Sequence, residues 1–247
     1  ALLADGVVTK NTSGLVRVGR DEVFAATTAL TLNLGELNLG GFITEAPLFT
    51  LVDGTLSNGT LRSGAGFVLN AGTVSANLTG TGALTKASAG TVLVDALASH
   101  LGGTTIEAGV LLLGRDGVLD ATAGVSLTGG TLDLGGFSTD AGSLVLGGGL
   151  IRNGILSATA IELRQGTVDA LLGGTGAVTK TTNGTVLLSG IVATSGGLGI
   201  SGGTLVLGAS NRINDATLLK LEAGGTFDLG GFYERVDRLR LLGGSII

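Results

Sequence analysis

The sequence predicts an all-β fold, a single-stranded parallel β-helix (β-solenoid) of about 13 coils with roughly 19 residues in each coil. Three observations support this prediction: segments of the chain recur at fixed offsets, glycine separates short apolar segments, and apolar and polar residues alternate within those segments. Such a chain repeats one small unit of strand and turn. It can bury its apolar side chains only by stacking successive units on one another.

The long repeat is visible in two matches. The segment Gly80–Lys86 (GTGALTK) recurs as Gly174–Lys180 (GTGAVTK), 94 residues later, and Gly130–Phe137 recurs as Gly225–Phe232, 95 residues later. An upstream copy that includes Lys10 contains the same short sequence motifs but is 19 residues shorter. We therefore expect one continuous solenoid over residues 1–247, part of a longer chain, with three long repeats at 1–75 (one coil short), 76–169 and 170–247.

The missing length equals a shorter repeat. A glycine that opens a Gly-x-aliphatic step recurs along the whole chain at spacings of 17 to 22 residues. A solenoid can lose one such coil while its flanks stay in register, because each coil contacts only its neighbours. Successive coils would pair their strands in parallel, and the usual chirality of crossover connections predicts right-handed winding.

Alternation within a coil predicts which side chains face inward. Val125–Thr128 alternates, Gly129-Gly130 turns the chain, and Thr131–Leu134 alternates again. Successive side chains of a strand point to opposite faces, so one face of each strand is apolar. A helix is excluded, because each interior glycine would cost about 1 kcal/mol. The predicted interior residues of this pattern are Leu127, Leu132, Leu134, Leu219, Leu221, Phe227 and Leu229.

The composition excludes several classes of protein. Glycine supplies 47 of 247 residues but there is only one proline, which excludes collagen. A hydrophobic content of 44% argues against disorder. The absence of cysteine excludes a disulfide framework and suits a secreted chain. The net charge of −5 gives no basic surface for binding nucleic acid. The sequence contains no run of 18 apolar residues, so we expect no membrane insertion by this segment.

No residue pattern predicts a catalytic, cofactor-binding or metal-binding site, so we expect a protein that is not an enzyme. The single histidine, His100, has no second histidine or cysteine to form a metal site, and we expect it in a loop between coils. Asp133 and Asp228 occupy equivalent places in two repeats, among Thr, Ser and Gly, and are expected to be solvated. A carbohydrate-active enzyme with paired carboxylates remains a third alternative.

One set of outward positions is apolar where other coils place a polar residue such as Ser75 or Asp169. These residues form two pairs from adjacent coils and are the candidate interaction patch: Leu93, Leu112, Leu187 and Val206. Each pair is either covered by its own return loop or exposed to a neighbouring chain; a shifted phase of the pattern is the third explanation.

Residues 80–114 and 174–208 resemble the autotransporter-associated β-strand repeat, also called the passenger-associated transport repeat. The second copy departs from the pattern at Leu198 and Gly199. The resemblance implies the passenger region of a large type V secreted protein at the surface of a Gram-negative bacterium, where such repeats assist secretion and folding. The first copy keeps Gly80, Gly82, Leu84, Lys86, Gly90, Gly102, Gly103, Thr104, Ile106, Gly109 and Gly114.

We therefore expect a non-enzymatic extracellular stalk or adhesin-like passenger segment that aids secretion and surface display. The alternative is a self-assembling fibre or surface-layer subunit, because neither Ala1–Leu3 nor Gly243–Ile247 resembles the polar cap that a solenoid needs. The expected partners are the chain itself, through end-to-end or lateral association, or ligands on cell surfaces. No cofactor and no nucleic acid are expected.

Overall fold

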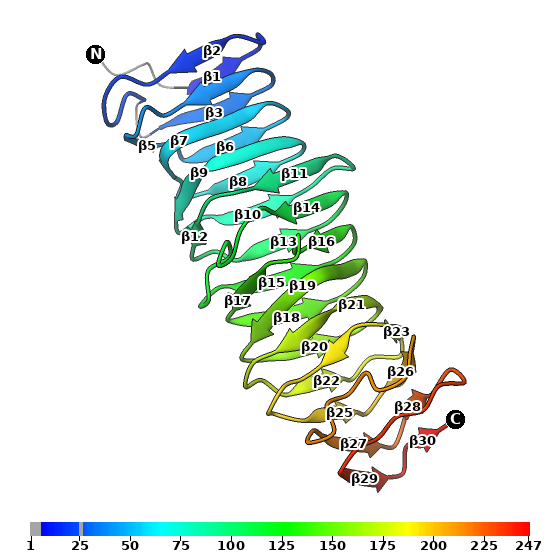
Figure 1. Cartoon of the computed structure of the whole chain (residues 1–247). Helices are drawn as coiled ribbons and strands as arrows, with labels where there is room; N and C mark the ends of the chain where they lie inside the picture. Colours follow the sequence, from blue (N-terminus) through cyan, green and yellow to red (C-terminus); the bar gives the residue numbers. More distant parts are fainter. Residues whose placement is uncertain (1–5, 25–26) are drawn as a thin grey trace. The chain divides into compact units, whose positions relative to one another are not determined.

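The computed structural model describes residues 6–24 and 27–247, and every regular element within these ranges is a β-strand. Parallel sheets stack as a β-solenoid of about 13 turns of roughly 19 residues (Figure 1), which confirms the predicted fold class. The right-handed winding stays a prediction. No helix long and apolar enough to cross a membrane occurs in the described ranges. The chain forms two compact units, residues 1–123 and 124–247, and its division into three long repeats stays a prediction.

Unit 1 contains two parallel β-sheets and a short third side (Figure 1). The first sheet contains β1 (Gly6–Lys10), β3 (Thr28–Leu32), β6 (Leu48–Leu51), β8 (Gly66–Leu69), β10 (Ala83–Lys86) and β13 (Thr104–Ile106). The second sheet contains β2 (Leu15–Arg17), β4 (Glu36–Asn38), β7 (Thr55–Arg62), β9 (Gly72–Gly80), β11 (Thr91–Val94) and β14 (Val110–Leu113). On the third side, β5 (Ile43–Glu45) and β12 (Ala98–His100) pair with the second halves of β7 and β9.

Unit 2 repeats this arrangement. Its first sheet contains β15 (Gly124–Leu127), β18 (Ser143–Leu146), β20 (Ile161–Leu163), β22 (Val178–Lys180), β25 (Leu198–Ile200), β27 (Leu218–Glu222) and β29 (Arg238–Leu242). Its second sheet contains β16 (Thr131–Asp133), β19 (Leu150–Ala158), β21 (Gly166–Gly173), β23 (Thr185–Leu188), β26 (Gly203–Leu207), β28 (Gly225–Asp228) and β30 (Ser245–Ile246). The third side carries β17 (Ser138–Ala141) and β24 (Ile191–Val192).

The core consists of aliphatic columns, because residues at the same place in adjacent coils lie opposite each other. In unit 1, Leu32 pairs with Leu51 and Leu51 with Leu69, and at most 1% of each is exposed. Burial of one such side chain contributes about 1.5–3 kcal/mol. Six of the predicted interior residues are buried as expected: Leu127, Leu132, Leu134, Leu219, Leu221 and Phe227.

Leu229 is the exception among the predicted interior residues, since it is half-buried. It lies just beyond the end of β28, and its backbone N–H donates to the Ile247 carbonyl oxygen at 2.8 Å. Ile246 and Ile247 are themselves 41% and 67% exposed. Leu229 therefore pairs with exposed residues and is only partly covered.

An Asn-Gly pair bends the second sheet into the third side. Asn58 and Asn153 occupy the same place in the two units with positive φ angles of 53° and 58°. The following glycine, Gly59, approaches the preceding coil so closely that an added Cβ would lie 2.6 Å from Leu39 Cβ. The register of β7 against β9 shifts at this point. The corner therefore requires asparagine, which tolerates the left-handed region, followed by glycine.

Candidate functional site

The four residues of the candidate interaction patch form two register pairs. Leu93 of β11 lies opposite Leu112 of β14 in unit 1, and Leu187 of β23 lies opposite Val206 of β26 in unit 2. Leu187 is 38% exposed, whereas the other three side chains are half-buried. Each pair therefore presents a narrow apolar ridge on the outer face of the second sheet. That these ridges bind a partner stays a prediction.

The register of these ridges differs from the one that glycine spacing predicts. Leu93 lies opposite Thr73, two residues before Ser75. Leu187 likewise lies opposite Thr167, two residues before Asp169. The phase of the sequence pattern was therefore shifted by two residues in β11 and β23. A shift of two keeps the side chains on the same face, so the ridges still point outward and a threonine borders each of them.

The carboxylate of Asp133 stabilises a turn. It accepts hydrogen bonds from the Gly135 backbone N–H at 3.0 Å and the Asn153 amide at 3.1 Å, and it forms an ion pair with Arg152 at 2.9 Å. Only 7% of the residue is exposed, so the prediction of a solvated carboxylate is wrong here. Asp228 accepts the Gly230 N–H at 2.8 Å. Both carboxylates are therefore turn caps of the Asx type.

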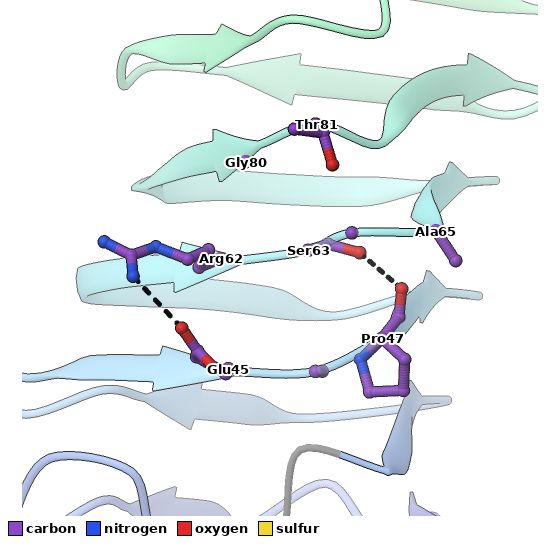
Figure 2. A pocket seen from close by; sticks show the side chains of 9 residues that line it. Glu45, Pro47, Arg62, Ser63, Ala65, Gly80 and Thr81 are labelled. Carbon is purple, nitrogen blue, oxygen red and sulfur yellow. Dashed lines mark hydrogen bonds and ion pairs between the residues drawn. The ribbon is translucent and has the colours of Figure 1, made fainter.

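A corner hollow of about 490 Å³ opens in unit 1 between the third side and the first sheet. Two pairs among its polar groups are visible in Figure 2: Arg62 with Glu45, which are 3.1 Å apart, and the Ser63 hydroxyl, which donates to the Pro47 carbonyl at 2.7 Å. The Arg62 and Glu45 side chains are 54% and 36% exposed, so their pairing adds little stability. The hollow offers a shallow contact surface, with no nucleophile activated by a base.

His100 lies in a strand and not in a loop, which corrects the sequence prediction. It ends β12, lies opposite Gly80 of β9, and is 1% exposed. Its ring centroid is 6.0 Å from that of Phe67. Burial lowers the pKa of the imidazole, and the negative charge of Asp120 acts in the opposite direction. No group of three or more His, Cys, Asp or Glu side chains in the described part of the chain could hold a metal ion.

Comparison with known proteins finds an informative match. The chain is 32% identical, over 87% of its length, to the Adhesin BmaC autotransporter of Brucella suis biovar 1 (strain 1330). The chain is homologous to part of an autotransporter adhesin. The match and the β-solenoid together confirm the predicted resemblance to autotransporter passenger repeat proteins. The alignment covers 7% of that adhesin. No protein-family model and no solved structure matches the chain.

Two lysines of this autotransporter-like segment are buried in the core. Lys86 and Lys180 are 0% exposed, and Lys86 stands in an aliphatic column between Leu69 and Ile106. Its ammonium group donates to the Ser88 carbonyl in its own turn and to the Ala108 carbonyl of the next coil at 3.2 Å. Lys180 donates in the same way to the carbonyls of Thr182 and Gly202. Burial lowers the pKa of both amines.

Alternation alone places polar and charged side chains on the outer face, so this pattern does not find the buried lysines. A usable signal was present, because Lys86 and Lys180 occupy the same place in the repeat motif, where other coils carry Leu or Ile. A charged residue that recurs at an inward position needs a partner. The two carbonyl oxygens of adjacent turns supply that partner, so the lysines join coils of the autotransporter-like segment.

Proposed function

We propose that the chain is a non-enzymatic, extracellular segment of an autotransporter passenger that contributes to an adhesive cell-surface structure. The observation that carries the proposal is the occurrence, in one chain, of a parallel β-solenoid and 32% identity over 87% of its length to an autotransporter adhesin. Binding to ligands on other cells is part of the proposal, because that relative is an adhesin.

The fold supports secretion by stepwise folding. Within each unit, neighbouring coils pair in parallel, so the edge of one folded coil is a template for the next. The chain has no cysteine, and its folding therefore needs no disulfide exchange at its destination. A segment of this kind could cross a membrane unfolded and gain stability coil by coil on the far side.

A non-enzymatic role is supported by what the carboxylate, lysine and histidine side chains do in the fold. Asp133 caps a turn, Lys86 and Lys180 bind backbone carbonyls, and His100 is enclosed in the core. Each of these groups is engaged in or enclosed by the fold. The corner hollow in Figure 2 likewise holds paired side chains of Glu45 and Arg62.

The first test is the position of the segment on intact bacteria that produce the protein. External proteinase and antibodies raised against the purified chain should both reach it before the outer membrane is opened. Protection of the chain in intact cells, with cleavage only after lysis, would overturn the proposal. A periplasmic protein serves as the control for membrane integrity.

The second test is adhesion of the purified chain. Labelled chain should bind host cells with a saturable signal that unlabelled chain competes away. The double variant Leu187→Thr, Val206→Thr replaces both apolar side chains of the unit 2 ridge with threonine, the residue found beside the ridge at Thr167. If this ridge contacts the host cell, the variant should bind more weakly. Lys220→Gln, on the outer face of the first sheet, is the matched surface control. If the chain is exposed on the cell surface but shows no saturable binding, the adhesive role is refuted and the segment acts only as a spacer.

A further inference from the structure

The corner of unit 1 encloses the only histidine of the chain. His100 ends β12, and its ring contacts that of Phe67 from β8 at an interplanar angle of 48°. The imidazole Nε2 lies 3.4 Å from the Thr104 hydroxyl of β13, while Nδ1 is buried and has no hydrogen-bond partner. The site thus offers the ring a single polar partner.

A single hydrogen-bond partner favours the neutral imidazole over the charged imidazolium. The neutral ring has one donor nitrogen and one acceptor nitrogen, whereas the imidazolium has two N–H donors. The Thr104 hydroxyl can satisfy one nitrogen at most. Protonation would therefore leave a buried charge with one unsatisfied N–H, an arrangement that is costly in an apolar surrounding.

The charges around the ring do little to compensate. The strands β8, β9 and β13 contain no titratable side chain. Lys86 faces inward from β10, the strand between β8 and β13, and is a like charge that would further disfavour the imidazolium. Asp120, in the return after β14, is the negatively charged group that acts on His100. Its carboxylate already accepts hydrogen bonds from the N–H and hydroxyl of Thr122 at 2.8 and 2.6 Å.

The equivalent corner of unit 2 lacks all three residues. Gly80 faces His100, and Gly174 faces Thr194 in the corresponding place 94 residues later. Ile161 replaces Phe67, and Leu198 replaces Thr104. The histidine, its aromatic neighbour and its hydroxyl partner therefore occur together in unit 1, and Thr194 shows that threonine fits such a corner.

The return that covers this corner pairs with β12 and carries an exposed turn. The Ala98 N–H donates to the Val118 carbonyl at 2.8 Å, and Ala98 forms an isolated bridge with Leu119. Residues 115–117 of the return are exposed. Exposed return segments open more readily than strands in the middle of a sheet, so the return 114–123 and the short strand β12 beneath it are the part that a destabilised corner would release.

We propose that His100 is an acid-sensitive lock: the neutral ring closes the corner of unit 1, and protonation releases β12 and the return 114–123. Between the lowered pKa of the folded ring and the ordinary value of about 6.5, the folded corner binds fewer protons than the unfolded chain. Opening should therefore become more frequent as the pH falls below that value, by at most about tenfold per pH unit for a single proton. The proposal does not depend on the adhesive function.

The direct test is NMR titration of the unmodified chain, in which the single histidine gives one unambiguous imidazole Hε1 signal. The titration midpoint should lie below 6.5, the ordinary value. Asp120→Asn should move it lower still, because the favourable charge is lost. A wild-type midpoint at or above 6.5 would overturn the proposal without any need for a variant.

Hydrogen exchange measures the opening itself. After correction for intrinsic rates, the amides of residues 98–101 and 118–123 should lose protection between pH 7 and pH 5, while those around Thr194 serve as the internal reference. His100→Thr should show protection that does not change over this range. Equal acid-induced loss in wild type and His100→Thr, or equal loss at the Thr194 corner, would overturn the proposal.

Discussion

Buried lysine is the least expected feature at the scale of single residues. An ammonium group is costly to remove from water unless hydrogen bonds replace its hydration. Lys86 recovers two such bonds from carbonyl oxygens of adjacent coils, and Lys180 does the same in unit 2. Lys10 makes the corresponding contact with the Leu34 carbonyl at 3.1 Å in a more exposed turn. The ammonium groups thus tie together turns that have no disulfide to hold them.

Replacing Lys86 by methionine tests this role. Methionine preserves the aliphatic stem but leaves the Ser88 and Ala108 carbonyls without their donor, and we expect a loss of about 1–2 kcal/mol in the free energy of unfolding. Lys220→Met is the matched control, because Lys220 lies on an outer face in an exposed ion pair with Glu222 and should cost less than about 0.5 kcal/mol. Urea unfolding of both variants gives the comparison; equal losses would contradict the proposed role.

At the scale of strands and corners, the sequence predicts the period better than the register. Glycine spacing and alternation were sufficient for the coil length and for buried positions such as Leu127 and Leu221. The alignment of β11 against β9 depends on how many residues each return uses, and a mean spacing does not contain that information. Leu93 was therefore placed two residues from its actual partner, Thr73.

The candidate site was harder to predict because burial at a corner depends on neighbouring coils. The His100 ring occupies an inward corner position opposite Gly80, and only the coil pairing brings the two residues together. The cap at Asp133 likewise needs Asn153, which lies 20 residues away in the next coil. Such contacts become visible only once the register is known.

The Asn-Gly corner predicts a strong position dependence for glycine substitutions. In Gly59→Ala the new Cβ would lie 2.6 Å from both Leu39 Cβ and the Phe42 carbonyl oxygen, at a φ of +149°. We expect a loss of about 1–3 kcal/mol in the free energy of unfolding, since the backbone must shift. Gly64→Ala has no atom within 4 Å of the new Cβ and should be nearly neutral. Thermal unfolding of the two variants checks this; a Gly59→Ala variant as stable as Gly64→Ala would contradict the corner geometry.

At the scale of the whole molecule, stability is a sum of coils and their nearest-neighbour contacts. The register makes this testable, because Phe49 lies opposite Phe67 in the first sheet and Ser57 lies opposite Ser75 in the second. Residues 49–66 therefore form one complete coil. Its removal would bring Leu30 opposite Phe67 and Asn38 opposite Ser75, which preserves the inward and outward faces of every strand.

Deletion of residues 49–66 should give a folded chain. Far-ultraviolet circular dichroism should keep its β-sheet signal per residue, and the amides of β10 and β13 should remain protected from exchange. The midpoint of urea unfolding should fall only modestly, because one coil and one interface are lost. Deletion of residues 49–57 is the control, since half a coil would join the first sheet to the wrong strand and should unfold unit 1. A chain that loses protection equally in both deletions would show that the coils do not stack as independent units.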